Sequence, residues 1–245
     1  MNRKRLGWMR RAGAWTAAWS AVAAVLLGTG AACAMPSEDP VALPAPLADE
    51  APAGRTIEKA VFSGGCFWGV QKVFQHIKGV QRAVSGYAGG GAGTANYDTV
   101  SGGSTGHAES VEVTFNPAVV SFGKLLQVFF SVAHNPTEVD RQGPDHGTQY
   151  RSEVFTTNDE QKRVAEAYIR QLDQAGIFGR RIATRVEPLP GFYAAEDYHQ
   201  DYATLHPDSR YIAIYDLPKV RNLEQFFPQL YRADPVLVAT SGAGH

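Results

Sequence analysis

The 245-residue sequence predicts an α+β fold in a single domain, with helices packed on a small sheet. Two observations predict this fold class. Stretches with the two-residue periodicity of strands alternate along the chain with stretches that have the periodicity of amphipathic helices. Hydrophobic residues make up 44% of the chain and aromatic residues 11%, which is enough for a buried core and excludes wholesale disorder. The domain is expected to span residues 57–232.

Each expected element follows from a local pattern. Apolar residues spaced by three and four positions predict a helix that begins at Cys66, directly after two glycines. Strict alternation of apolar and polar residues over 108–115 predicts a strand with one buried face. Ser121 and Asn158 are typical helix N-caps, and the second helix is expected to run to about Ala175. Strands are expected at 59–63, 80–86, 108–115, 150–156 and 181–186, helices at 66–77, 121–132, 158–175 and near 193–202, and polar loops over 86–106 and 135–149.

The first 34 residues have the organisation of a secretory signal peptide. Five basic residues lie within the first eleven positions, an apolar run follows over 12–30, and residues 32–34 form a small-residue cleavage pattern. We therefore expect a periplasmic or secreted protein after cleavage. Lipid anchoring through Cys33 is the alternative.

The segments that flank the domain differ from it in composition. Residues 35–56 contain five prolines, five alanines and four acidic residues, which predicts a semi-extended linker outside the core. Residues 233–245 end in small and polar residues, and they are expected to form a flexible tail.

Charge and cysteine content exclude several classes of protein. The chain has 23 basic and 24 acidic residues and a net charge of −1, so it has no general attraction for nucleic acid. Two cysteines are too few for a disulfide-rich scaffold or a four-cysteine zinc site. The seven histidines show no metal-binding spacing. We expect a monomer with no bound metal or cofactor and no nucleic-acid partner.

Cys66 is the candidate nucleophile. It lies where a strand gives way to a helix N-terminus, where the helix dipole and free backbone amides favour a thiolate. The alternative is a buried, inert cysteine, but a lone free thiol in an exported protein is a liability. Phe67 and Trp68 follow directly, and they either pack in the core or form the wall of an apolar pocket beside the sulfur.

Glu109 is the candidate proton donor. It shares strand parity with Val111, Val113 and Phe115, so its carboxyl group should point to the apolar face of the strand. Desolvation should raise its pKa and make it an acid near neutral pH. The alternative is that Glu109 lies at a frayed strand end and reaches water.

Four motifs resemble those of the A-class peptide methionine sulfoxide reductases. They are Gly-Cys-Phe-Trp-Gly at 65–69, Thr-Gly-His-Ala-Glu at 105–109, Asp-His-Gly-Thr-Gln-Tyr-Arg-Ser at 145–152 and Asp-Tyr-His-Gln-Asp-Tyr at 197–202. They occur in the order of that family, and any one of them alone would be weak evidence. The resemblance implies an α/β plait with helices packed on a mixed sheet. It also implies the thiol-dependent reduction of methionine S-sulfoxide, free or in oxidised proteins, in repair of oxidative damage.

The resemblance also implies a role for each site residue. Cys66 would be the nucleophile, and Phe67 and Trp68 would hold the substrate methyl group. Glu109 would protonate the sulfoxide oxygen. Tyr97, Tyr150 and Asp145 each belong to a residue type that is common in turns, so their roles depend mostly on the resemblance. The resemblance implies that Tyr97 and Tyr150 hydrogen-bond the sulfoxide oxygen and that Asp145 orders the site. His199 matches the fourth motif, and no chemical step is assigned to it.

The sequence departs from many relatives in its C-terminal region. Those relatives carry a resolving cysteine in a C-terminal tail, whereas residues 222–245 contain none. Regeneration is therefore expected to need an external thiol, either a thioredoxin-like protein or a small-molecule thiol. Competing hypotheses are a redox-responsive binding module, a cysteine hydrolase and a thiol peroxidase, and the four motifs disfavour all of them.

Overall fold

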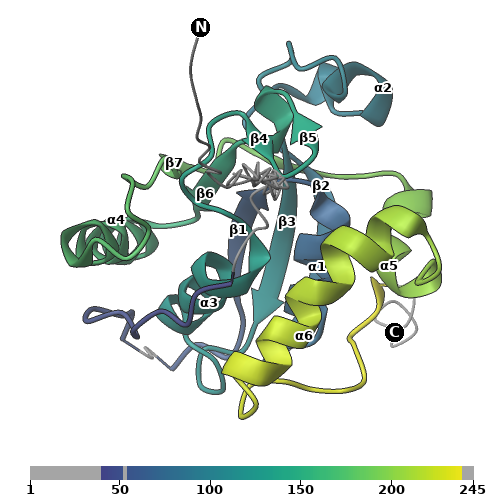
Figure 1. Ribbon diagram of the computed structural model, residues 1–245. Coiled ribbons are helices and arrows are strands. Elements are labelled where there is room, and N and C mark those ends of the chain that lie inside the picture. Colours follow the sequence, from purple (N-terminus) through teal and green to yellow (C-terminus); the bar gives the residue numbers. More distant parts are fainter. Residues whose placement is uncertain (1–39, 52–53, 239–245) are drawn as a thin grey trace, which may run out of the picture. The chain divides into compact units, whose positions relative to one another are not determined.

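The computed structural model describes residues 40–51 and 54–238. The predicted signal peptide over 1–34 and the end of the predicted tail lie outside these residues. Within them the predicted α+β fold is confirmed, since one mixed sheet carries the helices (Figure 1).

A six-stranded sheet organises the domain, with the strand order β7-β6-β1-β3-β2-β8. All neighbouring strands are antiparallel except β6 and β7, which pair in parallel. β4 and β5 form a separate two-stranded sheet. The bounds are β1 (Glu58–Gly64), β2 (Val80–Ala88), β3 (Ala108–Phe115), β4 (Arg141–Gln142), β5 (Asp145–His146), β6 (Ser152–Thr156), β7 (Arg185–Pro188) and β8 (Phe192–Ala194).

The helices pack against this sheet and against one another. α1 contacts β1, β2 and β3, α4 contacts β6 and β7, and α6 contacts α1 (Figure 1). The side chains of Ser121 and Asn158 accept hydrogen bonds from backbone N–H groups three residues later, so both predicted N-caps are confirmed. The bounds are α1 (Phe67–Gln75), α2 (Tyr97–Val100), α3 (Phe122–Val128), α4 (Asp159–Ala175), α5 (Tyr202–Leu205) and α6 (Leu217–Phe226), with π-helical turns at Phe129–Ala133 and Ile212–Asp216.

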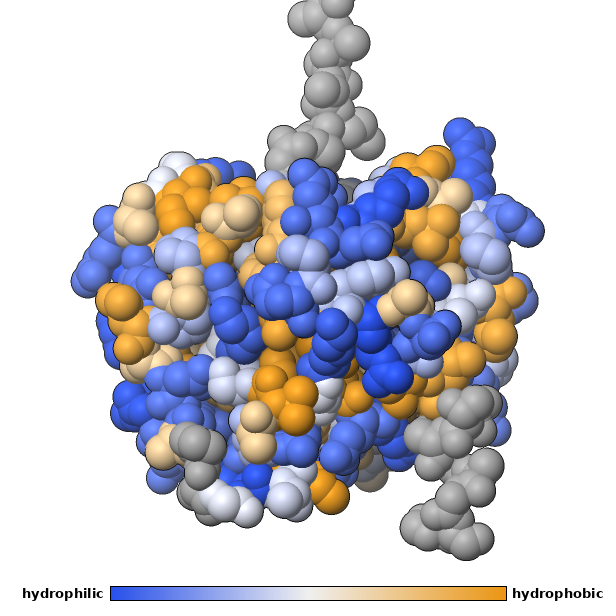
Figure 2. Space-filling model, turned by 90° about the horizontal axis from the view of Figure 1, so that it is seen from below, coloured by the Kyte–Doolittle hydropathy of each residue, from blue (hydrophilic) through white to orange (hydrophobic). Residues whose placement is uncertain are grey.

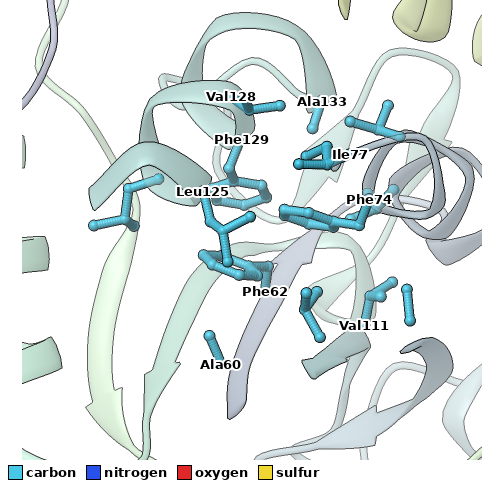
Figure 3. Packing of buried hydrophobic residues seen from close by; sticks show 14 of the residues in the cluster. Ala60, Phe62, Phe74, Ile77, Val111, Leu125, Val128, Phe129 and Ala133 are labelled. Carbon is cyan, nitrogen blue, oxygen red and sulfur yellow. The ribbon is translucent and has the colours of Figure 1, made fainter. Parts of the chain in front are cut away.

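The core lies between the sheet and the layer formed by α1 and α3 (Figure 3). The Phe62 ring of β1 lies 4.8 Å from that of Phe74 and 5.1 Å from that of Phe129, measured between centroids. The predicted apolar face of β3 is confirmed, because Val111, Val113 and Phe115 are fully buried in this cluster. Burial of each large apolar side chain contributes roughly 1.5–3 kcal/mol to the free energy of unfolding. The packing of this layer therefore fixes β3 and α1 relative to each other.

Residues 40–51, which we call the strap, are packed on the domain. The Val41 N–H donates to the Ser131 carbonyl at 3.1 Å, and Tyr168 Oη donates to the Pro44 carbonyl at 2.8 Å. Leu43 is buried in the core cluster. The prediction that 35–56 lies outside the core is therefore wrong for Leu43. Proline fixes an extended backbone in advance, so docking such a segment costs little further conformational entropy.

The predicted strand over 181–186 is displaced in the structure. Asp173 Oδ1 accepts a hydrogen bond from the Ile182 N–H, and the Pro136 carbonyl accepts one from the Ala183 N–H. These donors are therefore not available to a sheet, and pairing with β6 begins only at Arg185.

The two predicted loops contain more regular structure than expected, and the predicted tail makes more contacts with the domain than expected. Residues 86–106 contain the end of β2 and the short helix α2, and residues 135–149 contain β4 and β5. The first part of the predicted tail is attached to the domain: the Val236 N–H donates to the Gln75 carbonyl, and the Val238 N–H donates to the Asp201 carboxylate. The helix α6 was not expected.

The surface mixes hydrophobic and hydrophilic residues. Figure 2 shows a face on which hydrophobic residues form small patches among hydrophilic ones. Single exposed apolar side chains such as Leu47 are ordinary in soluble domains. In the part of the chain that the structure describes, no helix combines the length and apolar character needed to cross a membrane.

Candidate active site

A tight turn places Cys66 at the start of α1. Gly65, directly after β1, has a φ of +86°, and a Cβ at this position would lie 2.5 Å from the Gln142 Cβ. Only glycine fits both the backbone and the space. Cys66 is the N-cap residue of α1 and is 9% exposed, so the predicted strand-to-helix position of the thiol is confirmed.

The electrostatics around Cys66 favour the thiol. Burial raises the pKa of Cys66 well above its usual value, and the charge of Glu109 and then of Asp216 raises it further. A backbone hydrogen bond from Trp68 lowers the pKa, and Asp145 adds a smaller increase. Burial and the neighbouring carboxyl groups therefore outweigh the helix terminus and raise the pKa of the Cys66 thiol, which is contrary to the expectation of a stabilised thiolate.

Glu109 lies on the buried face of β3 and is 3% exposed. Its Oε2 accepts a hydrogen bond from the Phe67 N–H at 3.0 Å, which attaches the carboxyl group to the first turn of α1. Burial raises the pKa of Glu109 to about 8, and the bond from Phe67 offsets part of that rise. The acid predicted from strand parity is therefore mostly protonated at neutral pH.

Tyr97, Tyr150 and Asp145 converge on the same site. Burial raises the pKa of the Tyr150 phenol, and the charges of Glu109, Asp145 and Cys66 raise it further. The pKa of Tyr97 is raised by burial and by the same three groups. The short helix α2, which begins at Tyr97, and the 3-10 turn that ends at Tyr150 therefore lie near enough to Cys66 and Glu109 for their charges to interact.

Aromatic rings form one wall of the site. The Trp68 indole is stacked on Tyr202 with a centroid distance of 4.1 Å and lies edge-on to Tyr211 at 6.1 Å. Its Nε1 donates a hydrogen bond to His199 Nδ1 at 3.2 Å. Phe67 is 1% exposed and packs in the core, whereas Trp68 is half-buried. The partly exposed indole therefore offers an apolar surface beside the thiol.

Three residues of this site were not predicted. Tyr202 lies in the fourth sequence motif, so the motif could have indicated it. Tyr211 donates a hydrogen bond to the Asp145 carboxylate. The charge of Asp216 contributes to the raised pKa values of Cys66 and Glu109. The sequence gives no indication of Tyr211. Asp216 lies two residues before Pro218, a pattern that is typical of an ordinary helix start.

In the described residues, no cluster of three or more histidine, cysteine, aspartate or glutamate side chains has a geometry that could hold a metal ion. The described side chains at the site provide a thiol, carboxyl groups, phenols and aromatic rings. This set can attack an electrophilic centre and protonate a leaving oxygen.

Comparisons with known proteins identify the family. The family model described as peptide methionine sulfoxide reductase matches residues 58–230. The chain belongs to the peptide methionine sulfoxide reductase family. Peptide methionine sulfoxide reductase MsrA 2 of Mesorhizobium japonicum is 59% identical over 184 residues, which cover 75% of this chain and 94% of that protein. MsrA 2 of Synechocystis is 50% identical over 194 residues, which cover 78% of this chain and 91% of that protein.

Solved structures of this family have the same fold. Mxr1 from Saccharomyces cerevisiae in reduced form superposes with a TM-score of 0.58 at 32% identity, covering 65% of this chain and 91% of that chain. Methionine sulfoxide reductase A of Corynebacterium diphtheriae has a TM-score of 0.54 at 34% identity, covering 68% and 85%. The resemblance seen in the motifs is confirmed, and the chain is an oxidoreductase of the family that reduces methionine sulfoxide and so repairs oxidised methionine.

Proposed function

We propose that this peptide methionine sulfoxide reductase acts on the S-sulfoxide of methionine, free or protein-bound, through a sulfenic acid on Cys66. One observation carries the proposal. The Phe67 N–H holds Glu109 at 3.0 Å from the turn that begins at Cys66, so a thiol and a protonated carboxylic acid share one buried site.

The proposed reaction transfers one oxygen atom. The Cys66 sulfur attacks the sulfoxide sulfur as Glu109 donates its proton to the sulfoxide oxygen, and the carboxylate of Glu109 takes up the proton that leaves the thiol. The hydroxyl group is then transferred to the cysteine sulfur as the sulfur–oxygen bond of the substrate breaks. A thiol and a sulfoxide thereby give a sulfenic acid and a thioether, with Cys66 oxidised and the substrate sulfur reduced by two electrons.

The surrounding residues support the charge changes in this reaction. Negative charge develops on the sulfoxide oxygen before its protonation is complete, and the Tyr97 and Tyr150 phenols would donate hydrogen bonds to it in a site that excludes water. Their raised pKa values keep both phenols protonated. Asp145 accepts the hydrogen bond of Tyr211 and so holds β5 against the segment before α6.

Trp68 would hold the substrate methyl group, and Phe67, whose buried ring lies 6.5 Å from the indole between centroids, would support that pocket from the core side. The Trp68 indole is fixed on one side by stacking on Tyr202 and at its ring nitrogen by the bond to His199. An indole held in this way offers a flat apolar surface of fixed orientation, which suits a small apolar group beside the reacting sulfur.

An external thiol would regenerate Cys66. Cys66 is a free cysteine in the structure, and the chain has one other cysteine, Cys33. A thiol would condense with the sulfenic acid, releasing water and forming a mixed disulfide, and a second thiol would then release Cys66. Either a thioredoxin-like protein or a small-molecule thiol fits this chemistry. We also propose export to the periplasm or cell exterior, supported by the basic and apolar organisation of residues 1–34.

Titration of Cys66 in the presence of a methyl sulfoxide tests the proposed chemistry. With one equivalent of peptide methionine S-sulfoxide and no reductant, we expect the loss of one thiol per enzyme and the formation of one thioether. A thiol peroxidase would instead lose its thiol only to a peroxide, and a hydrolase or a simple binding module would lose none. The R-sulfoxide serves as the stereochemical control and should leave Cys66 reduced.

A further inference from the structure

A partly buried carboxylate, that of Glu196, links the sheet to the short helix α2. Glu196 Oε2 accepts a hydrogen bond from Tyr87 Oη at 2.9 Å, and Glu196 Oε1 accepts one from the Tyr97 N–H at 3.0 Å. Tyr87 lies on β2 and is fully buried, whereas Tyr97 is the first residue of α2. The two oxygens of one side chain therefore hold two different elements together.

The sheet fixes the position of Glu196. β8 pairs with β2, and directly after β8 the Ala195 N–H donates to the Ser85 carbonyl at 2.9 Å. The Glu196 carbonyl accepts a hydrogen bond from the His199 N–H at 2.9 Å, which closes the 3-10 turn that follows. Burial raises the pKa of Glu196, but the hydrogen bonds that it accepts outweigh burial and lower the pKa overall. Both oxygens are therefore acceptors at neutral pH.

Tyr87 connects this carboxylate to the strand position beside the acid of the site. In the antiparallel pairing of β2 with β3, Tyr87 lies directly opposite Glu109. Opposite residues of such a pair point to the same face of the sheet. On the other side of the carboxylate, the Tyr97 ring packs against the His199 ring with a centroid distance of 4.6 Å. Glu196 therefore connects Tyr97 to the part of the sheet that carries Glu109.

The helix α2 is too short to fix Tyr97 by itself. It has four residues, Tyr97–Val100, and helices of this length are not stable in isolation. The first N–H groups of a helix have no acceptor within it, and Glu196 supplies the acceptor for the N–H of Tyr97. Just beyond the other end of α2, Gln149 Nε2 donates to the Ser101 carbonyl at 3.1 Å. The bond to Glu196 therefore fixes the start of α2, and with it Tyr97, relative to the sheet.

We propose that Glu196 is a positioning residue for sulfoxide reduction, and that its carboxylate holds Tyr97 where the phenol donates a hydrogen bond to the sulfoxide oxygen. The inference rests on the proposed role of Tyr97. Glu196 transfers no proton in this scheme, because it acts through Tyr97. A hydrogen bond to a developing charge weakens steeply when donor and acceptor are misaligned. A small displacement of α2 should therefore slow the chemical step while the nucleophile and the acid stay in place.

A double-mutant cycle of Glu196→Ala and Tyr97→Phe in the full chain tests this inference. Glu196→Ala removes both acceptor oxygens, and Tyr97→Phe removes the phenol through which Glu196 acts. The single-turnover rate constant for thioether formation is measured at saturating methionine S-sulfoxide, so that neither substrate affinity nor regeneration by an external thiol enters the result. Removal of such a donor costs roughly 10²–10³-fold, and its displacement should cost part of that. We expect Glu196→Ala to lower the rate constant about tenfold alone, but less than about twofold in the Tyr97→Phe background.

Glu196→Gln and Asp98→Asn are the matched controls. The amide of the first variant keeps an oxygen for the Tyr97 N–H, and the Tyr87 hydroxyl can accept a hydrogen bond from its NH₂ group. This variant should therefore keep most of the wild-type rate. Asp98 is exposed on α2, so Asp98→Asn removes a charge next to Tyr97 without removing the bond to Glu196. Its rate should equal that of the wild type.

The outcomes separate this inference from the proposed function. A folded Glu196→Ala whose rate is unchanged, or falls equally in both backgrounds, overturns the inference. A Glu196→Gln as slow as Glu196→Ala also overturns it, because the side chain would then act through its charge. An unchanged rate in Tyr97→Phe alone would instead show that the proposed role of Tyr97 is wrong, and the inference fails with it. If Glu196→Ala does not fold, Glu196→Asp replaces it with the same expectations, because its shorter side chain cannot reach both donors.

Discussion

At the scale of single residues, the site favours the protonated forms of two groups, the Cys66 thiol and the Glu109 carboxyl group. Burial raises the pKa of both Cys66 and Glu109. The charge of Glu109 raises the pKa of Cys66 further, and the charges of Asp145 and Asp216 raise the pKa of Glu109. Sequence parity predicts the acid at Glu109, but it gives no indication of the protonation state of the thiol. That state depends on the carboxylates of Asp216 and Asp145, which arrive from other segments of the chain.

The first prediction concerns the pH dependence of turnover. The reaction needs the protonated form of Glu109, whose pKa is raised to about 8. The kcat/KM should therefore be nearly constant below pH 7 and should fall as pH rises through about 8. A steady-state profile with excess reductant between pH 6 and pH 10 measures this. A profile that stays flat to pH 10 would contradict the role of Glu109.

The second prediction concerns the acid itself. Glu109→Gln preserves an oxygen that can accept the Phe67 N–H bond, but it removes the acidic proton. Turnover should fall by on the order of 10²–10⁴-fold with little change in substrate binding. Single-turnover kinetics on a methyl sulfoxide separate the two effects. Unchanged turnover across pH 6–8 would mean that the carboxyl group takes no part in the reaction.

The third prediction concerns the nucleophile. Cys66→Ser should abolish sulfoxide reduction, because a hydroxyl oxygen is a poor nucleophile toward sulfur. The circular dichroism spectrum should match the wild type, since the N-cap position also accepts serine. Substantial reductase activity in this variant would show that Cys66 is not the nucleophile.

At the scale of elements, local patterns predict only part of the structure. Helices capped by Ser121 and Asn158 and the alternating strand β3 were predictable, because each depends on neighbouring residues. The strap was not, because the burial of Leu43 depends on contacts with a distant part of the chain, where Gln127 Nε2 of α3 donates a hydrogen bond to the Leu43 carbonyl. The stripe of Val220, Leu223 and Phe227 has helical spacing, but it is short, so α6 and its charges carry little sequence signal.

The same limit applies to the site. The motifs include Cys66, Glu109 and the residues of the aromatic wall up to Tyr202. Tyr211 and Asp216 join the site only because the π-helical turn at Ile212–Asp216 and α6 pack on α1, and no spacing in the sequence predicts that contact.

The fourth prediction concerns the strap. Burial and the neighbouring Glu58 raise the pKa of Glu50 to about 7. Glu58 itself pairs with Arg55 at 2.8 Å. The folded state therefore holds a proton on Glu50 that the unfolded chain releases near pH 4.5, and this contribution to stability is lost as pH rises through about 7.

Chemical denaturation at pH 5 and pH 8 measures this effect. The loss of unfolding free energy between the two values should be smaller in Glu50→Gln, because a neutral amide does not titrate. Glu166→Gln, on the exposed part of α4, is the control. Equal losses in wild type and Glu50→Gln would show that the strap carboxyl is not coupled to stability.

At the scale of the whole molecule, the fifth prediction concerns recycling. With Cys66 as the reacting thiol, one equivalent of substrate should leave a sulfenic acid, which a dimedone-type reagent traps with an increase in mass. Without reductant each enzyme molecule should release one thioether and stop, and an external thiol should restart turnover. A Cys33–Cys66 disulfide found by peptide mapping after substrate treatment would contradict this scheme.

The docked strap also sets the length of the tether available to Cys33. The bond from the Val41 N–H to Ser131 fixes the chain eight residues after Cys33. Eight residues span at most about 29 Å, whereas a free linker to residue 57 would allow roughly three times that reach. If lipid were attached at Cys33, the catalytic domain would have to remain within about one domain diameter of the bilayer. An anchored enzyme of this kind would act on oxidised proteins at the membrane surface and could not reach far beyond it.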